Sequence, residues 1–229
     1  PQPPALPDTV VETLENEKRY ESIVNGRRYY VLGKRYAIFP QRSGQLVIPR
    51  ERFNGSRGRG SIFARKQPVS AVSKSHSILV KTIPAVFSGE NWLPARTLSL
   101  QETWTEAMPT FRVGEPVNRT ITLSATGLSS TTLPGMSEFK VANAKVYADP
   151  PVTENQVSED GVSALQVTTI GIVPTETGEL YLPEISIPWW NTLTEQQEVA
   201  VLPAATFTVL PSLTQAADIP TVTVPVTEL

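Results

Sequence analysis

The side chains that could carry out chemistry are few and widely separated along this chain. His76 is the one histidine, and the sequence contains no cysteine. Nucleophilic catalysis needs a nucleophile beside a base that a third group orients, and no Gly-x-Ser-x-Gly turn is present to supply a serine for His76. We therefore interpret His76 as a surface residue at the start of a strand. The sequence predicts no catalytic residue and a protein that is not an enzyme.

Metal ligands are equally scarce. The acidic residues Asp149, Glu154, Glu159 and Asp160 lie close together in sequence but lack the alternating Asp-x-Asp spacing of calcium loops. Asp160 is also required by a tight Asp-Gly turn, and the absence of cysteine excludes thiolate-ligated zinc and iron–sulfur sites. We expect neither a metal nor another cofactor.

A basic loop is the first candidate binding site. Residues 50–66 contain six Lys or Arg and one acidic residue, with Phe53 and Phe63 near the ends. Arg-Gly runs with aromatic residues can bind single-stranded nucleic acid, but the chain as a whole is slightly acidic, so we expect no nucleic-acid partner. A solvated hairpin loop and a docking loop for an acidic protein or lipid surface both remain open. The candidate residues, called the basic loop below, are Arg57, Arg59, Arg65 and Lys66.

The second candidate is the pair Trp189-Trp190. Adjacent side chains of a strand point to opposite faces, so one tryptophan is expected in a core and the other exposed or packed on a neighbour. An exposed tryptophan is typical of interface anchors and of stacking platforms for sugars. Burial of both rings at a sheet corner is the alternative.

Charge is divided unevenly along the chain. Residues 1–94 hold 15 Lys or Arg and 7 Asp or Glu, a net charge of +8, whereas residues 95–229 hold 5 and 15, a net charge of −10. The first part would attract anionic partners and the second would repel them. Two alternatives remain open: unrelated divergence of two modules in charge, and a complementary contact between the modules.

A repeated pattern indicates the architecture that positions these residues. The segment from Ile38 to Pro49 returns from Ile172 to Pro183 at a constant offset of 134, with Ile, Pro, Gly, Leu and Pro identical. Each copy follows a turn dipeptide, Asn25-Gly26 or Asp160-Gly161. A repeat of this length predicts a duplicated domain rather than a short solenoid unit.

Short alternating segments between turns predict an all-β fold of tandem immunoglobulin-like β-sandwich modules. The expected division is a first module over residues 1–84, a linker over 85–94, a second module over 95–211 and an extended tail over 212–229. Only 24 residues precede Asn25-Gly26, against about 65 before the equivalent turn, so the first module is expected to be N-terminally incomplete. Its sheet edges would then need a cover.

Several segments together resemble the BatD family, which is linked to oxygen tolerance and Bacteroides aerotolerance. The similar segments are residues 35–44, 92–96, 111–117, 119–123 and 185–190. The resemblance implies an exported protein, anchored in the inner membrane of a Gram-negative bacterium, with tandem immunoglobulin-like domains in the periplasm. It also implies gene neighbours that encode MoxR-type ATPases and von Willebrand A-domain membrane proteins.

The resulting hypothesis is a non-catalytic scaffold or adaptor whose partners are the von Willebrand A-domain proteins. The membrane anchor and signal that the family carries are expected in a segment outside this chain. Two alternatives stay open: modules that act as a surface or adhesin-like spacer, and a glycan-binding module that uses Trp189 or Trp190.

Overall fold

The structure is a computed structural model that describes residues 3–14, 17–57, 67–136, 140–158 and 161–213. The fold is all-β, with a single short 3₁₀ turn among the described residues, Ser130–Thr132. No described helix is long and apolar enough to cross a membrane. The chain divides into two compact units, each described here by itself: unit 1 is Pro1–Phe87 with Val157–Gly161, and unit 2 is the remainder.

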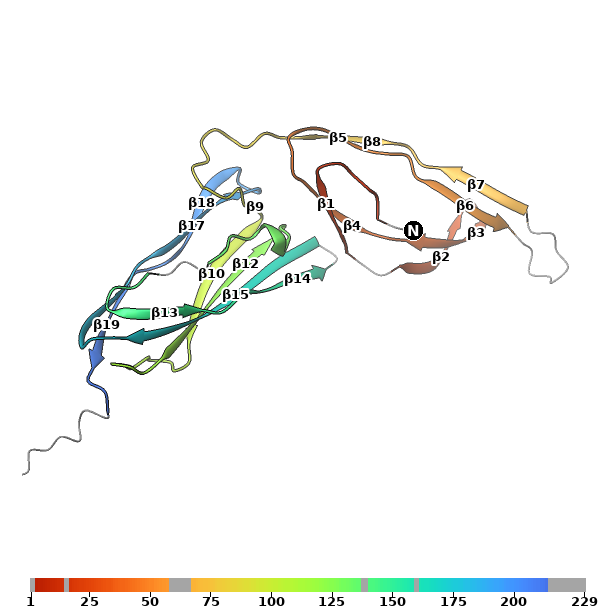
Figure 1. Cartoon of the computed structure of the whole chain (residues 1–229). Helices are drawn as coiled ribbons and strands as arrows, with labels where there is room; N and C mark the ends of the chain where they lie inside the picture. The colour runs from red at the N-terminus through yellow and green to blue at the C-terminus, as the bar shows by residue number, and fades with distance from the viewer. Residues whose placement is uncertain (1–2, 15–16, 58–66, 137–139, 159–160, 214–229) are drawn as a thin grey trace, which may run out of the picture. The chain divides into compact units, whose positions relative to one another are not determined.

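Unit 1 consists of antiparallel strand pairs (Figure 1). The pairs are β1 with β4, β2 with β3, β5 with β8 and β6 with β7. Their bounds are β1 Thr9–Thr13, β2 Lys18–Val24, β3 Arg27–Gly33, β4 Tyr36–Pro40, β5 Gly44–Ile48, β6 Arg52–Arg57, β7 Gln67–Val72 and β8 His76–Val80. The Leu14 N–H donates to the Arg35 C=O at 2.9 Å and the Ser73 N–H to the Glu51 C=O at 2.9 Å. These bonds join the pairs end to end into two long ribbons.

Turn chemistry explains the β2–β3 hairpin. Asn25 has φ 51° and Gly26 has φ 73°, the two positive values that a type I′ turn requires. The Asn-Gly dipeptide therefore places the hairpin where the sequence predicted it. The glycine- and serine-rich pattern of residues 54–61 predicts irregular structure, but Asn54 to Arg57 pair with β7 as part of β6.

Unit 2 is a β-sandwich. One sheet has the order β10-β12-β15-β13, with β14 also paired to β15, and it faces two three-stranded sheets, β11-β19-β16 and β18-β17-β9. The bounds are β9 Pro94–Ala95, β10 Thr97–Trp104, β11 Phe111–Arg112, β12 Val117–Thr126, β13 Ala144–Ala148, β14 Val152–Ser158, β15 Gly161–Pro174, β16 Gly178–Leu182, β17 Ile185–Asn191, β18 Gln196–Leu202 and β19 Ala205–Leu210.

Strict alternation builds the core of unit 2. Every second residue of β12 and β15 is buried, which places Ile121, Leu123, Ile170 and Ile172 on the inner face. They meet apolar residues of the opposing sheets, including Leu180, in one continuous core cluster. Burial of an alternating face of this kind is the main source of stability for a sandwich.

Arg119 interrupts that apolar face. It is only 4 % exposed, and its Nε donates to Glu102 Oε2 at 2.7 Å. The guanidinium also lies over the Trp104 ring, 5.5 Å from the ring centroid. The charge is therefore held in the wall of the sandwich by one carboxylate and one aromatic face.

The repeat predicted from sequence has the same structure in both copies. Gly44 and Gly178 open equivalent strands with φ of 115° and 121°, and no atom lies within 4 Å of a Cβ at either position. Leu46 and Leu180 are buried, and each copy pairs antiparallel with the strand that closes its unit, β8 or β19. The prediction that these segments are equivalent is confirmed.

Two boundaries differ from those predicted. The apolar pattern predicts one strand over residues 179–187 and one over residues 198–210, but each segment forms two strands, divided after Leu182 and after Leu202. Pro183 and Pro203 explain the breaks, because proline cannot donate a ladder hydrogen bond. The same kind of pattern predicts a closing strand of unit 1 over residues 76–83, but β8 ends at Val80.

Candidate partner-binding surface

The β2–β3 ribbon is the candidate partner-binding surface of unit 1. Tyr30 is 85 % exposed and Ile23 is 71 % exposed, and Tyr20, Tyr29 and Leu32 are also exposed. Large apolar side chains on a two-stranded ribbon have no second layer to bury them. The ribbon therefore has the exposed apolar surface that is typical of interaction sites.

Register places apolar residues on both faces of this ribbon. Tyr20 is opposite Val31 on one face, whereas Tyr30 is opposite Glu21 and next to Leu32 along the other. A strand with one buried face normally alternates apolar and polar residues, and Tyr29-Tyr30 breaks that rule. Such a ribbon resembles an interior strand that lacks its neighbours.

Basic residues frame the aromatic ones. Arg19 is paired with Glu17 at 2.6 Å and Arg28 with Glu21 at 3.5 Å, both at the surface. A hollow of about 580 Å³ follows the ribbon, lined by Arg19, Tyr20, Glu21, Tyr30, Val31 and Leu32. Exposed pairs of this kind contribute little stability, so an incoming carboxylate can replace Glu17 or Glu21 at low cost.

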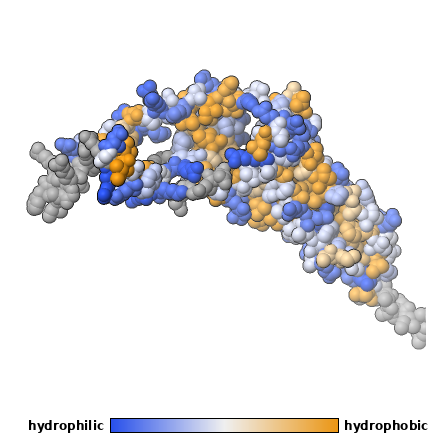
Figure 2. Space-filling model, turned by 180° about the vertical axis from the view of Figure 1, so that it is seen from behind, coloured by the Kyte–Doolittle hydropathy of each residue, from blue (hydrophilic) through white to orange (hydrophobic). Residues whose placement is uncertain are grey.

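The rest of unit 1 also exposes large hydrophobic side chains. Leu46 is its one buried hydrophobic residue among those described. Figure 2 shows hydrophobic residues at the surface, interleaved with hydrophilic ones. The exposed large hydrophobic residues of unit 1 are Tyr20, Ile23, Val24, Tyr29, Tyr30, Leu32, Val47, Phe53, Val69, Val72, Ile78, Leu79, Ile83, Val86 and Val157.

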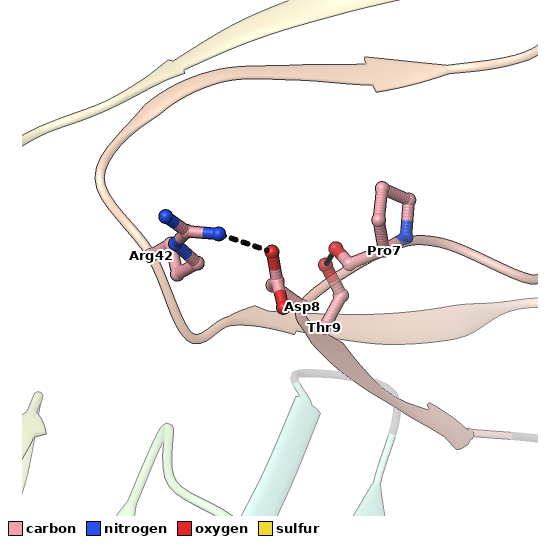
Figure 3. A network of polar contacts seen from close by, with 4 residues as sticks. All are labelled: Pro7, Asp8, Thr9 and Arg42. Atoms are coloured by element: carbon pink, nitrogen blue, oxygen red, sulfur yellow. Dashed lines mark hydrogen bonds and ion pairs between the residues drawn. The ribbon is translucent and has the colours of Figure 1, made fainter.

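A polar network lies at the end of the β1–β4 pair, between the residues before β1 and the turn after β4 (Figure 3). Arg42 Nη1 donates to Asp8 Oδ2 at 3.1 Å, and the Thr9 hydroxyl donates to the Pro7 C=O at 2.8 Å. The Gln41 N–H donates to the Asp8 C=O at 2.8 Å, which ties the chain before β1 to the turn after β4. Asp8 adopts φ 46°, a conformation that aspartate tolerates better than most residues. The network closes the ribbon and leaves its apolar faces uncovered.

The basic loop lies mostly beyond the described part of the chain. The backbone of Arg57 ends β6, and Arg59, Arg65 and Lys66 are outside the described residues. The prediction that these side chains bind a partner is therefore still a prediction. His76 begins β8 and is exposed, as the sequence indicated.

The two tryptophans have different environments. Trp189 is 4 % exposed and belongs to the core cluster, whereas Trp190 points to the other face. There its ring packs against Trp92, with the ring centroids 5.9 Å apart and the planes tilted by 37°. Trp190 is half-buried by this contact, so the ring is an incomplete platform for a sugar.

The described residues contain no group of three or more His, Asp or Glu side chains that could hold a metal ion. The arrangement of unit 1 instead offers apolar contact, cationic side chains and unpaired strand edges. Exposed apolar surface and open strand edges are features typical of protein-interaction surfaces.

No protein-family model, no curated protein and no solved structure matches this chain.

The tyrosines of the β2–β3 ribbon are not among the binding residues predicted from the sequence. The run Tyr29-Tyr30-Val31-Leu32 is typical of a strand by propensity alone. The available signal was the adjacent apolar residues, because neighbouring side chains in a strand cannot share one core. That pattern places apolar side chains on both faces of the strand.

Proposed function

We propose that this chain is a non-catalytic adaptor that binds a protein partner through unit 1. The observation that carries the proposal is the contrast between the units: unit 2 has a continuous core, whereas unit 1 buries Leu46 and exposes the apolar faces of its ribbons. Solvent-exposed apolar surface on this scale marks an interaction site. Unit 2 would serve as the rigid support.

The partner that best fits unit 1 is an acidic protein with an apolar contact patch. Residues 1–94 have a net charge of +8, from 15 basic and 7 acidic residues. An acidic partner would be attracted over about 8 Å at physiological ionic strength. Aromatic anchors such as Tyr20 and Tyr29, which share one face of the ribbon, would then supply most of the affinity, because buried tyrosines are common hot spots.

The resemblance to the BatD family supplies a context for this adaptor. In that context the two units are immunoglobulin-like domains at the periplasmic face of the inner membrane, held there by a segment outside this chain. The partners are the von Willebrand A-domain membrane proteins of the same operon, which act with a MoxR-type ATPase in oxygen tolerance. No nucleic acid and no cofactor take part.

Binding to the soluble part of such an A-domain protein tests the proposal. We would measure by surface plasmon resonance the affinity of the full chain and of a variant with Tyr20→Ser and Tyr29→Ser, two residues on one face of the ribbon. Loss of two aromatic anchors is expected to weaken binding at least tenfold. The matched control is Tyr181→Ser, which removes an equally exposed tyrosine from β16 of unit 2 and should change the affinity less than twofold.

Two results would count against the proposal. Unchanged affinity of the double variant would show that the β2–β3 ribbon is not the contact surface. Absence of any binding to the A-domain protein would contradict the partner that the BatD resemblance implies. The adaptor role would then have to be tested with other acidic proteins of the envelope.

A further inference from the structure

Strand β17 has an edge that is only partly paired. On one side it pairs with β18 along its whole length, from Ile185 to Asn191. On the other side it meets β9, which contains two residues and reaches only Trp190 and Asn191. The first half of β17 therefore has no neighbouring strand on that side among the described residues.

Hydrogen-bond direction identifies the groups on this open edge. The Trp190 N–H donates to the Leu93 C=O at 3.0 Å, so even-numbered residues of β17 direct their backbone groups toward β9. By the same alternation, the N–H and C=O of Ser186 and the C=O of Pro188 face the open side. Pro188 has no N–H, and proline within a sheet is confined to edges of this kind.

A groove runs along the open edge. It has a volume of about 420 Å³ and is lined by Ser88–Asn91, Leu93, Pro134–Met136 and Ile185–Pro188. Three of these residues, Leu93, Met136 and Ile187, are apolar and also belong to the core cluster. The groove combines apolar contact with unpaired backbone groups, which are the two requirements for binding an extended peptide.

Two of the segments that line the groove are held by hydrogen bonds within unit 2. The Ser88 N–H donates to Gln197 Oε1 at 2.8 Å, and Gln197 Nε2 donates back to Ser88 Oγ at 3.0 Å. In the second segment, the Pro134 C=O accepts from Gln166 Nε2 at 3.0 Å, and Gln166 is buried. A preformed groove loses little entropy when a peptide enters it.

We propose that this groove binds an extended, basic segment of a partner protein, which adds to the edge of β17 as a short strand. Charge selects the basic segment: Glu90 is exposed on the rim, and residues 95–229 have a net charge of −10, from 5 basic and 15 acidic residues. One donor and two acceptors of Ser186 and Pro188 would bond the peptide backbone. Alternate apolar side chains would cover Leu93, Met136 and Ile187. This site is separate from the surface proposed for unit 1 and does not depend on it.

The probe is a fluorescent heptapeptide that alternates valine with lysine, titrated by anisotropy with the full chain. Binding is expected with a Kd below about 1 mM. Two further peptides carry N-methyl groups, one on the valines and one on the lysines. Because only one set of backbone N–H groups faces β17, one N-methylated peptide should lose binding at least tenfold while the other keeps it.

Protein variants test the location. Gly135→Leu should weaken binding at least tenfold, since no atom lies within 4 Å of a Cβ there and the new side chain would fill the groove. Glu90→Lys should weaken binding about three- to fivefold. Its control, Glu179→Lys, makes the same charge change on β16, which does not line the groove, and should have less than a twofold effect.

Several outcomes would overturn the proposal. One is the absence of binding up to 1 mM peptide, and another is equal binding of both N-methylated peptides. Equal effects of Glu90→Lys and Glu179→Lys would show that the peptide responds to the net charge of unit 2 and not to Glu90 at the groove. Unchanged affinity of Gly135→Leu, with the thermal transition of unit 2 intact, would place the peptide elsewhere.

Discussion

Replacing Glu102 by alanine should destabilise unit 2 more than replacing its partner Arg119 by methionine. Glu102→Ala removes the carboxylate that accepts from Arg119 Nε at 2.7 Å, and it leaves a guanidinium whose side chain is only 5 % exposed. Breaking a fully buried pair in this way costs about 3–5 kcal/mol, because the remaining charge is uncompensated. Glu102 is 30 % exposed, so water can enter beside Arg119 and lower the cost to about 2–3 kcal/mol.

Replacing the other member of this ion pair, Arg119, provides the comparison. Arg119→Met keeps an apolar stem against Trp104 and leaves a carboxylate that already reaches water. Its cost should be about 1 kcal/mol or less, because the burial of a charge is removed together with the pair.

Thermal unfolding of the full chain measures both effects. Near-UV circular dichroism at the tryptophan bands follows unit 2, where Trp104 packs edge-on against Phe111 with centroids 5.9 Å apart. At about 4 °C per kcal/mol for a domain of this size, Glu102→Ala should lower Tm by about 8–12 °C and Arg119→Met by about 4 °C or less. Equal losses, or a larger loss for Arg119→Met, would refute the reasoning that the uncompensated charge dominates.

Three other predictions concern the repeat and the charge. Gly178→Val should cost about 1–3 kcal/mol because the position has φ 121°, whereas Gly135→Val, without a positive φ, should unfold within about 0.5 kcal/mol of the parent in urea titrations. Leu180→Ala should cost about 3–5 kcal/mol, since Leu180 is fully buried in the core cluster, and Leu46→Ala less than half of that, since Leu46 lies outside the cluster; denaturation of each variant compares them. Serine in place of all four residues of the basic loop should slow association with an acidic partner at low salt more than it speeds dissociation, and equal rates at two salt concentrations would contradict a role for the loop.

Local patterns in the sequence were sufficient for the parts of the fold that depend on neighbouring residues. Asn25-Gly26 determined a turn because few dipeptides accept two positive φ values. The alternation from Thr97 to Trp104 fixed β10 at its observed bounds. The repeat identified Gly44 and Gly178 as equivalent because a strained backbone position limits the choice of residue.

Features that depend on distant residues could not be read in this way. Arg119 lies on the inward face of β12, in line with Ile121. The charge is tolerated there because Glu102 of the neighbouring strand β10 accepts a hydrogen bond from it, and the sequence of β12 alone does not reveal this contact. Exposure of Tyr30 was also hidden, because alternation reports which side chains share a face and not whether another layer covers it. Part of the edge of β17 is open because β9 contains only two residues. A strand of two residues is too short to show any alternation, so its length cannot be predicted from the sequence.

Two parallel pairings of unit 2 have a consequence for synthesis on the ribosome. β9 pairs with the end of β17, and β11 pairs with β19, so strands near the start of the unit depend on partners about 100 residues later. A nascent chain released only as far as Thr192 would lack the partners of both β11 and β16, and its core could not close. The ribbons of unit 1, by contrast, pair mainly with near neighbours and can form as they emerge. Unit 1 would therefore carry exposed apolar faces from the time it emerges, so an early-bound partner or a chaperone could already act on it before unit 2 is complete.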